Sequence, residues 1–449
     1  MSNSFISPDD IRARFSRAMS VMYRAEVPAY GALLDLVALA NKRALDADPV
    51  LKKKLSESDN LARINEERHG AIRVGTASEL KMMARVFGVM GMRPVSYYDL
   101  TQANVPVHST AFRSVDAASL SRSPFRVFCS LLRTELIQDA NLRKTSDEIL
   151  EARDIFTPAL YELVDKTEKD GGLNEGDTKE FIDQATYTFK WHKDAAVDKE
   201  FYEELCDADP RAADIVCFKG PHINHLTPRT LDIDIIHAEM PRRGMNAKNV
   251  VEGPPPGCPI LLRQTSFKAL TEDVLFDGVA GSHTARFGEI EQRGAALTPK
   301  GRALYDELLA EVRRRIIPAP DGSNADEYMK ILDDVFEKFP SSPAEMREQK
   351  LAYFQYFVTE KGLAEGLNHD DIEELIAGGL VDYLPITYED FLPVSAAGIF
   401  SSNASDKTRV DTFKSSSQDA FEKALGQSVA SEFDLYQAME DESLKAVLG

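Results

Sequence analysis

Residues 284–294 read Thr-Ala-Arg-Phe-Gly-Glu-Ile-Glu-Gln-Arg-Gly, and the alternation of their side chains predicts a β-strand. Successive side chains of a strand point to opposite faces, so Phe287, Glu289, Glu291 and Arg293 lie on one face. Burying such a charged face without partners costs roughly several kcal/mol. The face is therefore either solvated or the lining of a site that uses its charges. The residues upstream of this strand favour the second interpretation.

The composition limits the kinds of partner that this protein can have. The chain has 449 residues, 43% of them hydrophobic, and a formal net charge of −20. This length predicts about two to four domains. The negative charge argues against binding to nucleic acid or to an anionic membrane surface. No run of about 18 apolar residues is present, so we expect no membrane span. Residues 1–10 also lack the basic and apolar regions of a secretion signal.

The cysteines are widely separated in the sequence and form no Cys-x-x-Cys pair. Such usage is typical of free thiols in a reducing compartment, and it predicts neither a disulfide framework nor a structural zinc site. We therefore expect a cytoplasmic globular protein. The cysteines are Cys129, Cys206, Cys217 and Cys258.

The order of the predicted elements indicates an α+β fold in which a β-α-β-β-β pattern occurs twice. The second occurrence shows one strand fewer than the pattern requires. Helical sequence precedes, separates and follows the two modules. The predicted regions are an N-terminal helical region (1–60), the first module (61–142), a helical insertion (143–214), the second module (215–297) and a C-terminal helical region (298–449).

Several local signals predict where individual elements begin and end. The first helix is expected to start with Asp9 or Asp10 as its N-cap, and a helix over 79–90 with Thr76 or Ser78. In the second module, Thr227 is expected to cap a helix with Pro228 in its first turn. Strands are predicted over 68–75, 94–100, 109–115, 125–132, 216–226, 260–267 and 284–293. Helices in the C-terminal region are predicted over 299–316, 325–339 and 342–358.

Two of the eight histidines occupy matching places in the two modules. His69 lies in the first strand of the first module, and His225 lies at the end of the first strand of the second. Two imidazoles and one carboxylate leave three coordination positions open, which is the arrangement of non-haem Fe(II) oxygenases. His222 competes with His225, but residues three apart in a strand face opposite ways, so both cannot serve one metal.

Two further features indicate a binding site for a small acid. Arg73 follows His69 by four residues and lies on the same side of the segment in a strand or a helix. Its guanidinium suits a substrate carboxylate, and the alternative is a surface salt bridge. Residues 391–400 read Phe-Leu-Pro-Val-Ser-Ala-Ala-Gly-Ile-Phe, small and apolar without a helical or strand period. Such a segment is typical of a buried or ligand-facing loop.

Four separated segments in this order resemble the 2-oxoadipate dioxygenase/decarboxylase family, also called 2-hydroxyglutarate synthase. This family is a branch of the vicinal oxygen chelate superfamily, whose barrels are built from paired β-α-β-β-β modules. The resemblance covers nearly the whole chain and implies that barrel here. The segments are His69–Arg73, the segment around His225, Arg286–Gly294 and Phe391–Phe400.

The resemblance implies an Fe(II) enzyme that takes a 2-oxo dicarboxylate and O2. In that family the 2-oxo acid chelates iron through its carboxylate and keto oxygens, and O2 binds alongside. Release of CO2 and hydroxylation of the remaining chain would turn 2-oxoadipate into 2-hydroxyglutarate, a step in lysine catabolism. The resemblance assigns His69, His225 and a glutamate to the metal, and Arg73 to the distal carboxylate. It also implies that Val394 and Ser395 help to position the substrate.

The identity of the glutamate ligand depends on a second resemblance. Glu289 and Glu291 share a face and lie about 7 Å apart along a strand, so one of them is expected to bind the metal. The related 4-hydroxyphenylpyruvate dioxygenases carry Glu-x-x-Gln-Arg with the glutamate as ligand, which favours Glu289. Glu291 is then expected to hold a ligand histidine or an arginine. Arg113 and Gln264, on other predicted strands, are weaker candidates for the pocket.

Two other functions are compatible with the same residues. One is a related metal-dependent dioxygenase that acts on a different 2-oxo acid or uses another divalent metal, because one fold hosts several chemistries. The other is a non-catalytic 2-oxo acid sensor, which would bind the acid without consuming O2. Loss of a ligand would be its sequence signature, and all three expected ligands are present.

Overall fold

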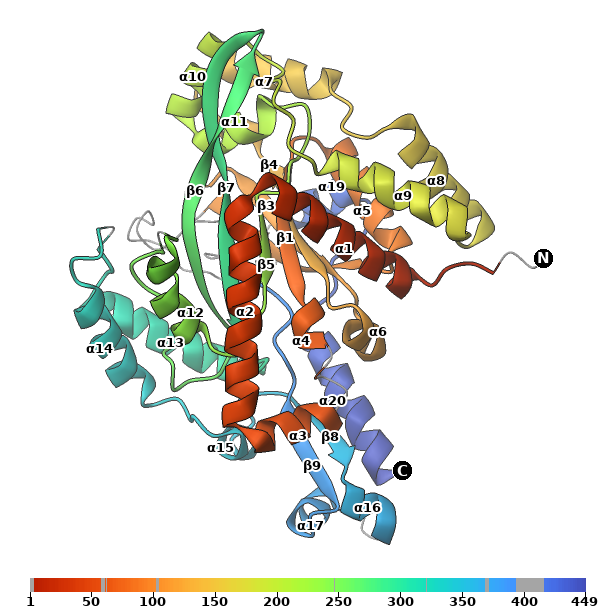
Figure 1. The fold of residues 1–449 in the computed structure, drawn as a ribbon, viewed down its shortest axis with the longest axis vertical. Helices are drawn as coiled ribbons and strands as arrows, with labels where there is room; N and C mark the ends of the chain where they lie inside the picture. The colour runs from red at the N-terminus through yellow and green to blue at the C-terminus, as the bar shows by residue number, and fades with distance from the viewer. Residues whose placement is uncertain are drawn as a thin grey trace.

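The structure is a computed structural model, and Figure 1 shows its fold. It describes residues 4–57, 61, 63–101, 105–245, 247–319, 321–367, 371–392 and 416–449. The strands are β1 (Arg68–Val74), β2 (Arg93–Asp99), β3 (Val107–Arg113), β4 (Arg126–Leu132), β5 (His225–Pro228), β6 (Leu262–Phe276), β7 (Val279–Arg293), β8 (Phe354–Val358) and β9 (Val381–Pro385).

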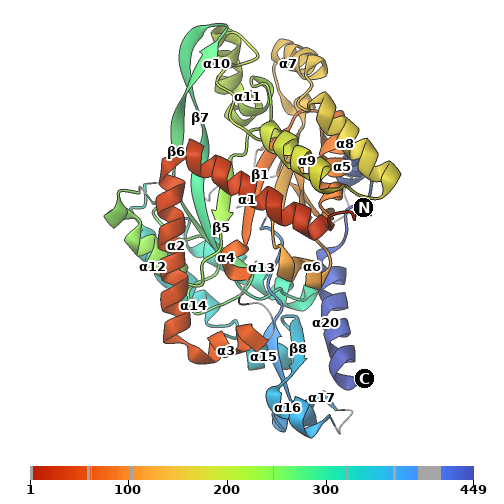
Figure 2. The same ribbon diagram turned by 45° about the vertical axis from the view of Figure 1, so that its right-hand side comes forward.

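Helices surround the strands on most sides, so the chain is a mixed α and β protein (Figures 1 and 2). Within the described residues, no helix has an apolar stretch long enough to cross a bilayer. The helices are α1 (Pro8–Glu26), α2 (Pro28–Ala47), α3 (Pro49–Glu57), α4 (Arg63–Glu66), α5 (Ala77–Val89), α6 (Ala117–Arg122), α7 (Ala140–Ala152), α8 (Pro158–Asp170), α9 (Glu175–Thr188), α10 (Lys199–Ala208), α11 (Pro210–Val216), α12 (Ile233–Glu239), α13 (Pro299–Arg315), α14 (Ala325–Phe336), α15 (Pro343–Glu348), α16 (Glu360–Glu365), α17 (Ile372–Ala377), α19 (Ser416–Leu425) and α20 (Glu432–Leu448).

A curled sheet forms the centre of the molecule. Its strand order is β2-β3-β4-β1-β5, with β1 parallel to β4 and antiparallel to β5. The long β6–β7 hairpin runs beside β5 (Figure 1). Two backbone hydrogen bonds join it there, from the amide of Thr230 to the carbonyl of Glu291 at 2.8 Å and from Phe287 to Asn224 at 3.1 Å. The curl therefore brings β1, β5 and β7 side by side.

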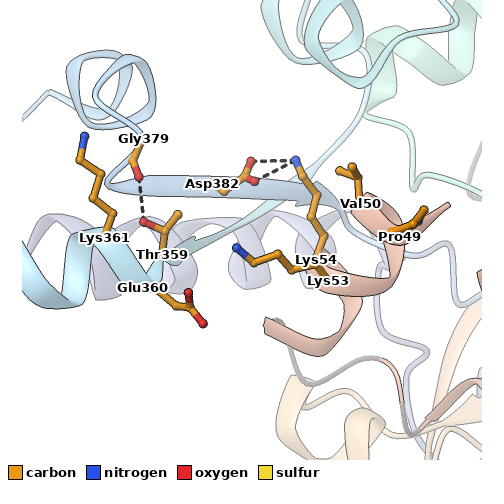
Figure 3. Close-up of a pocket in the computed structure, with 9 residues that line it drawn as sticks. All are labelled: Pro49, Val50, Lys53, Lys54, Thr359, Glu360, Lys361, Gly379 and Asp382. Carbon is orange, nitrogen blue, oxygen red and sulfur yellow. Dashed lines mark hydrogen bonds and ion pairs between the residues drawn. The ribbon is translucent and has the colours of Figure 1, made fainter.

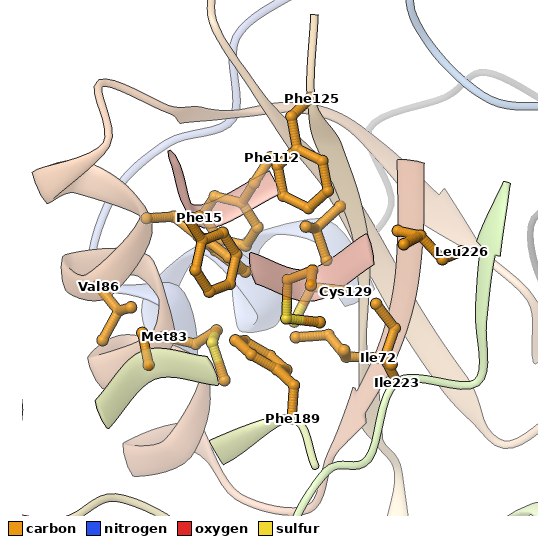
Figure 4. Close-up of a cluster of buried hydrophobic side chains, with 14 of the residues drawn as sticks. Phe15, Ile72, Met83, Val86, Phe112, Phe125, Cys129, Phe189, Ile223 and Leu226 are labelled. Carbon is orange, nitrogen blue, oxygen red and sulfur yellow. The ribbon is translucent and has the colours of Figure 1, made fainter. Parts of the chain in front are cut away.

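The outer face of the sheet packs against α1, α5 and the end of α9 (Figure 4). Ile72 of β1 and Cys129 of β4 point into this layer and meet Phe15, Met83 and Phe189. Burying each large apolar side chain contributes roughly 1.5–3 kcal/mol. Because side chains alternate along a strand, the residues next to Ile72 in β1 must face the inner side of the sheet.

Local capping chemistry explains two helix starts. The hydroxyl of Thr76 accepts a hydrogen bond from the amide of Glu79 at 3.1 Å, and the Glu79 carboxylate accepts one from the amide of Thr76 at 3.3 Å. This capping box confirms Thr76 as the predicted cap. The predicted caps Asp9 and Asp10 are wrong, because Ser7 caps α1. Pro8 occupies the first helical position, where its missing N–H costs nothing.

The prediction of a strand over 216–226 is wrong for most of its length. Helix α11 extends to Val216, residues 217–224 form no regular strand, and β5 begins only at His225. Thr227 and Pro228 lie within β5 and do not begin a helix, because this segment pairs with the edge of β1. The following helix, α12, is capped by Asp232.

The predicted helix over 342–358 is also wrong beyond Glu348. Residues 354–358 form β8, which pairs with β9 in a separate two-stranded sheet. The predicted strands 260–267 and 284–293 are parts of longer strands, because β6 and β7 continue outwards as one hairpin. The four cysteines are free, as their spacing predicted.

A groove of about 510 Å³ lies between α3 and the β8–β9 sheet (Figure 3). Lys54 and Asp382 form an ion pair of 2.9 Å across it. Its described lining contains no histidine and no cysteine, so it offers no nitrogen or sulfur ligand for a metal. The groove is therefore a poor candidate for a site that binds a transition metal.

Candidate metal and substrate site

His69, His225 and Glu289 meet at the inner face of the sheet, from β1, β5 and β7 respectively. One ligand atom from each lies within 4.8 Å of the other two, and all three side chains are buried. His69 Nε2 is 3.3 Å, and His225 Nε2 3.8 Å, from Glu289 Oε1. The structure thus brings together the three residues that the sequence suggested as ligands.

Strand pairing accounts for this convergence. In the antiparallel β1–β5 pair, His225 lies opposite Ala71 and Thr227 opposite His69. Gly288 precedes the carboxylate in β7, and a Cβ built there would lie 1.7 Å from the Phe267 ring. Only glycine lets that ring cross β7 at this position.

The donor set fits a divalent metal ion. Glu289 Oε1 accepts hydrogen bonds from Thr227 Oγ1 at 3.0 Å and Gln264 Nε2 at 3.2 Å. Among the described residues, Glu289 Oε2 has no hydrogen-bond partner although it is buried. A buried carboxylate oxygen without a donor is costly unless a cation binds it. Two imidazoles and this carboxylate form the facial set typical of non-haem iron.

The electrostatics of the cluster also favour a cation. Burial lowers the pKa of His225 to about 4, which keeps its imidazole neutral. Burial alone would raise the pKa of Glu289, but the imidazoles beside it, above all His69 with its raised pKa, hold the Glu289 pKa below its ordinary value. A neutral imidazole and an ionised carboxylate are the forms that bind a metal. Burial opposes charge on His69, but Glu291 and Glu289 raise its pKa, as expected where carboxylates attract positive charge.

Glu291 lies on the same face of β7 as Glu289 but has different neighbours. Its carboxylate accepts two hydrogen bonds from Arg293, at 2.7 and 2.9 Å, and lies 3.4 Å from Arg126. Its Oε1 is 3.1 Å from His69 Nδ1, the ring nitrogen that faces away from Glu289. The structure therefore separates the two carboxylates, because Glu289 lies within the cluster of His69 and His225 whereas Glu291 lies behind His69.

Glu291 belongs to a buried set of ion pairs that we call the arginine–glutamate network. Arg126 contacts Glu67 at 2.7 Å and also Glu389, while Arg63 contacts Glu389 at 2.8 Å and Arg229 contacts Glu67 at 2.6 Å. Buried charges of this kind are tolerated only when paired. The network consists of Arg63, Glu67, Arg126, Arg229, Glu291, Arg293 and Glu389.

The network and its neighbours anchor the segment that leads into the predicted loop 391–400. Arg113 holds Asp390 with two hydrogen bonds of 2.7 and 2.8 Å. The Phe391 ring packs edge-on against His69, with the ring centroids 4.8 Å apart. Val394 and Ser395 lie outside the described residues. Gln264 contacts the cluster through Glu289, whereas Arg113 acts on this segment and not on the ligands.

Arg73 lies on the same face of β1 as His69, two strand repeats further along. Its Nη1 donates a hydrogen bond of 2.7 Å to Asp214 Oδ2, and its side chain is 18% exposed. No other hydrogen bond from this guanidinium occurs among the described residues, so its remaining donors are available. Asp214 also contacts His222 and His283, so His222 belongs to a cluster different from that of His225.

Sequence reasoning predicted that Glu291 holds a histidine or an arginine, but it missed Asp214, His283 and the members of the arginine–glutamate network from other segments. Glu67, Arg126 and Glu389 come from three distant segments, and nothing in their local sequence distinguishes them from surface charges. The only sequence signal for such partners is the charged face of the strand over 284–293, whose charges need partners if that face is buried.

The chain is similar over most of its length to a family model and to several known proteins. A family model described as 2-oxoadipate dioxygenase/decarboxylase matches residues 15–403. The chain is 54% identical to the 2-oxoadipate dioxygenase/decarboxylase of Pseudomonas putida over 452 residues, covering 99% of this chain and 97% of that one. It is also 54% identical to that of Escherichia coli, over 99% and 98% of the two chains. The crystal structure of hydroxyglutarate synthase from Pseudomonas putida with 2-oxoadipate is similar over 99% of both chains, with a TM-score of 0.93 and 54% identity.

Proposed function

Because the chain belongs to the 2-oxoadipate dioxygenase/decarboxylase family, we propose that it converts 2-oxoadipate and O2 into 2-hydroxyglutarate and CO2. The reaction removes the carboxyl carbon next to the keto group as CO2. One oxygen atom of O2 enters the new carboxylate, and the other becomes the hydroxyl group, so atoms balance. We place the reaction in the cytoplasm and in lysine catabolism.

We propose that Fe(II) is the metal and that His69, His225 and Glu289 hold it. The observation that carries the proposal is their grouping within 4.8 Å, with the buried Oε2 of Glu289 lacking a hydrogen-bond donor in the described chain. Three protein ligands leave room for a bidentate 2-oxo acid and for O2. Bound Fe(II) would supply the activation of O2 and polarise the keto group.

The chain's own residues have distinct parts in this proposal. Arg73 binds the distal carboxylate, because it lies on the same inner face of β1 as His69 and its guanidinium uses only Nη1 to contact Asp214. Glu291, whose Oε1 lies 3.1 Å from His69 Nδ1, would place a negative charge behind this imidazole and so favour Nε2 as the atom that faces the metal. Phe391 covers one side of the His69 ring and excludes water. Val394 and Ser395 complete the substrate pocket from the loop 391–400.

We further propose that the curled sheet is a vicinal oxygen chelate barrel. The order β1-α5-β2-β3-β4, with the short helix α6 between β3 and β4, supports the first β-α-β-β-β module, and β5-α12-β6-β7 supports a second that is one strand shorter. The matching first strands, β1 and β5, carry His69 and His225. The proposed regions keep the boundaries predicted above.

The test is O2 consumption by protein loaded with Fe(II) under anaerobic conditions and then given 2-oxoadipate in air-saturated buffer. We expect equimolar O2 uptake, with 2-hydroxyglutarate identified by mass spectrometry. His69→Ala should abolish iron binding and uptake. His237→Gln is the matched control, because His237 lies outside both histidine clusters and its hydrogen bond to Thr265 can be kept by glutamine.

Two other outcomes would contradict the proposal in different ways. O2 uptake with 2-oxoglutarate but not with 2-oxoadipate would support the proposed metal site but show that the substrate is a different 2-oxo acid. Binding of 2-oxoadipate to iron-loaded protein without O2 uptake would indicate a sensor.

A further inference from the structure

A second buried cluster lies directly beside Arg73. Asp214 Oδ1 is 2.8 Å from His283 Nε2 and 3.0 Å from His222 Nε2. Its other oxygen, Oδ2, accepts hydrogen bonds from Arg73 Nη1 at 2.7 Å and from Asn224 Nδ2 at 3.3 Å. Each carboxylate oxygen therefore faces two nitrogen atoms.

This cluster could in principle hold a metal ion, since ligand atoms of Asp214, His222 and His283 lie within 4.8 Å of one another. The neighbouring cation Arg73 opposes a second positive charge on the same carboxylate. The Tyr202 hydroxyl lies 2.8 Å from His283 Nδ1. If this hydroxyl donates to Nδ1, the imidazole carries its proton on Nε2, which faces Asp214. The contacts therefore favour a hydrogen-bonded network over a metal site.

Aromatic packing holds the two imidazoles in place. Trp191 stacks on His283 with an interplanar angle of 4° and meets His222 edge-on, with ring centroids 4.8 Å apart. Phe218 packs against His283 at 4.5 Å. Side chains locked by packing in this way give a hydrogen bond a fixed direction.

Three residues of this cluster and its aromatic packing come from one part of the sequence. Trp191, Tyr202 and Asp214 lie in the helical insertion 143–214, and α11 delivers Asp214 next to β1. Arg153, from the same insertion, donates to the carbonyls of Ile215 and Phe218 at 2.6 and 2.9 Å. The insertion thus has a structural connection to the substrate side of the proposed site.

We propose that Asp214 is a positioning residue that orients Arg73 towards the substrate carboxylate, and that His222 and His283 fix Asp214. The inference rests on the proposed function, because it takes Arg73 as the residue that binds the distal carboxylate. It gives the insertion a specific task, which is to set the direction of this guanidinium.

The physical advantage is preorganisation. A free arginine side chain loses much rotamer freedom when it binds a ligand. Asp214 removes part of that freedom before the substrate arrives, and only Nη1 is used to do so. The other donors then point in a fixed direction, so a 2-oxo acid with a carboxylate at the right distance binds best. Selectivity for the dicarboxylate should therefore depend on Asp214 through Arg73.

The test compares 2-oxoadipate with 2-oxohexanoate, which has the same number of carbons but no distal carboxylate. We measure the ratio of the two kcat/KM values in Asp214→Asn, Arg73→Ala and the double variant. We expect Asp214→Asn to lower the ratio about tenfold, within the range of interactions between contacting side chains. In the Arg73→Ala background, the same change should have no further effect on the ratio.

Two controls separate positioning from general damage. Asp209→Ala removes the N-cap of the same helix, α11, without touching the cluster, so it should lower thermal stability but leave the ratio unchanged. His283→Ala should lower the ratio, whereas His283→Gln, which keeps a donor towards Asp214, should restore most of it. These histidine variants also provide the test if Asp214→Asn fails to fold.

Several results would overturn the inference. Asp214 does not act through Arg73 if Asp214→Asn leaves the ratio of kcat/KM values unchanged. The same conclusion follows if Asp214→Asn lowers that ratio equally in the wild-type and Arg73→Ala backgrounds. Two metal ions per wild-type chain, falling to one in Asp214→Asn, would assign the cluster to a metal.

The role of Asp214 can also be tested if the proposed dioxygenase function is wrong. If the wild-type protein consumes no O2, the ratio is measured as dissociation constants by calorimetry in the same variants. A ratio of dissociation constants that falls in Asp214→Asn only when Arg73 is present would support positioning in a protein that is not an oxygenase. Binding of neither acid by the wild type would refute both proposals.

Discussion

Replacing Glu291 with glutamine removes one negative charge from the arginine–glutamate network. The network has four arginines and three glutamates. The Glu291 carboxylate lies 2.7 and 2.9 Å from nitrogen atoms of Arg293 and 3.4 Å from Arg126. Both arginines are buried, so neither can turn to water when the charge is lost. Breaking a buried ion pair by removing one partner costs about 3–5 kcal/mol. Glutamine keeps one acceptor oxygen, so we expect about 3 kcal/mol of lost unfolding free energy.

The same substitution should weaken the metal site. Glu291 Oε1 lies 3.1 Å from His69 Nδ1, so the substitution would remove the negative charge behind this imidazole and would make the imidazole less basic. Removing such a partner typically lowers metal affinity about 10- to 100-fold. We would measure unfolding by urea with circular dichroism on metal-free protein, and affinity by Co(II) titration followed by visible absorption.

Glu168→Gln is the matched control for this experiment. Glu168 also makes two hydrogen bonds to an arginine, Arg85, but its side chain is 54% exposed. Surface pairs contribute less than about 1 kcal/mol, so the control should lose little stability and no metal affinity. If Glu291→Gln lowers the unfolding free energy no more than Glu168→Gln does, burial does not make the ion pairs of this network more stabilising than surface pairs. Unchanged Co(II) affinity would refute the role of Glu291 behind His69.

Two further predictions concern stability. Gly288→Ala should lower the unfolding free energy by about 1–3 kcal/mol, because its Cβ would lie 1.7 Å from the Phe267 ring. Gly88→Ala, whose Cβ meets nothing within 4 Å in α5, should instead be neutral or stabilising, and equal melting temperatures for the two variants would contradict this. Burial, helped by Arg133, lowers the pKa of His108 to about 4, below the ordinary value of about 6.5 in the unfolded chain. As pH falls from 6.5 to 4 the unfolded chain binds the proton first, so metal-free protein should lose up to roughly 3 kcal/mol from this group. His108→Gln should flatten urea-derived stability over that window, and identical pH slopes for the two proteins would contradict the assignment.

The parts of the fold that sequence predicted well depend on local chemistry. The capping box Thr76–Glu79 lies within four residues, and the structure has the helix where the sequence put it. The outer and inner faces of β1 and β7 also follow from alternation alone. The failures are segments decided by distant partners. Residues 216–226 are apolar enough for a strand, but only His225 onwards reaches the edge of β1.

The candidate site was predictable only in part for the same reason. The matching places of His69 and His225 in the two modules suggested these two histidines, whereas resemblance to known families was needed to favour Glu289 over Glu291. Arg73 and Asp214 are 141 residues apart, and Arg126 and Glu389 are 263 apart. No local pattern links such pairs, because their pairing exists only after the sheet has curled. Sequence gave Arg73 a substrate role but could not reveal the carboxylate that holds it.

The register of β7 explains why two glutamates on one strand face have different environments. Glu291 forms an isolated β-bridge with Arg229, and its carbonyl accepts from the amide of Thr230, which fixes its position beyond the end of β5. That position faces the arginines. Glu289, one strand repeat earlier and about 7 Å away, comes level with Thr227 and the two imidazoles. A shift of one residue would turn both carboxylates into the hydrophobic layer occupied by Ile290, where neither has a partner. Only one register of β7 therefore gives each buried charge a partner. In that register Glu291 faces the arginines and Glu289 faces the two imidazoles of the proposed metal site.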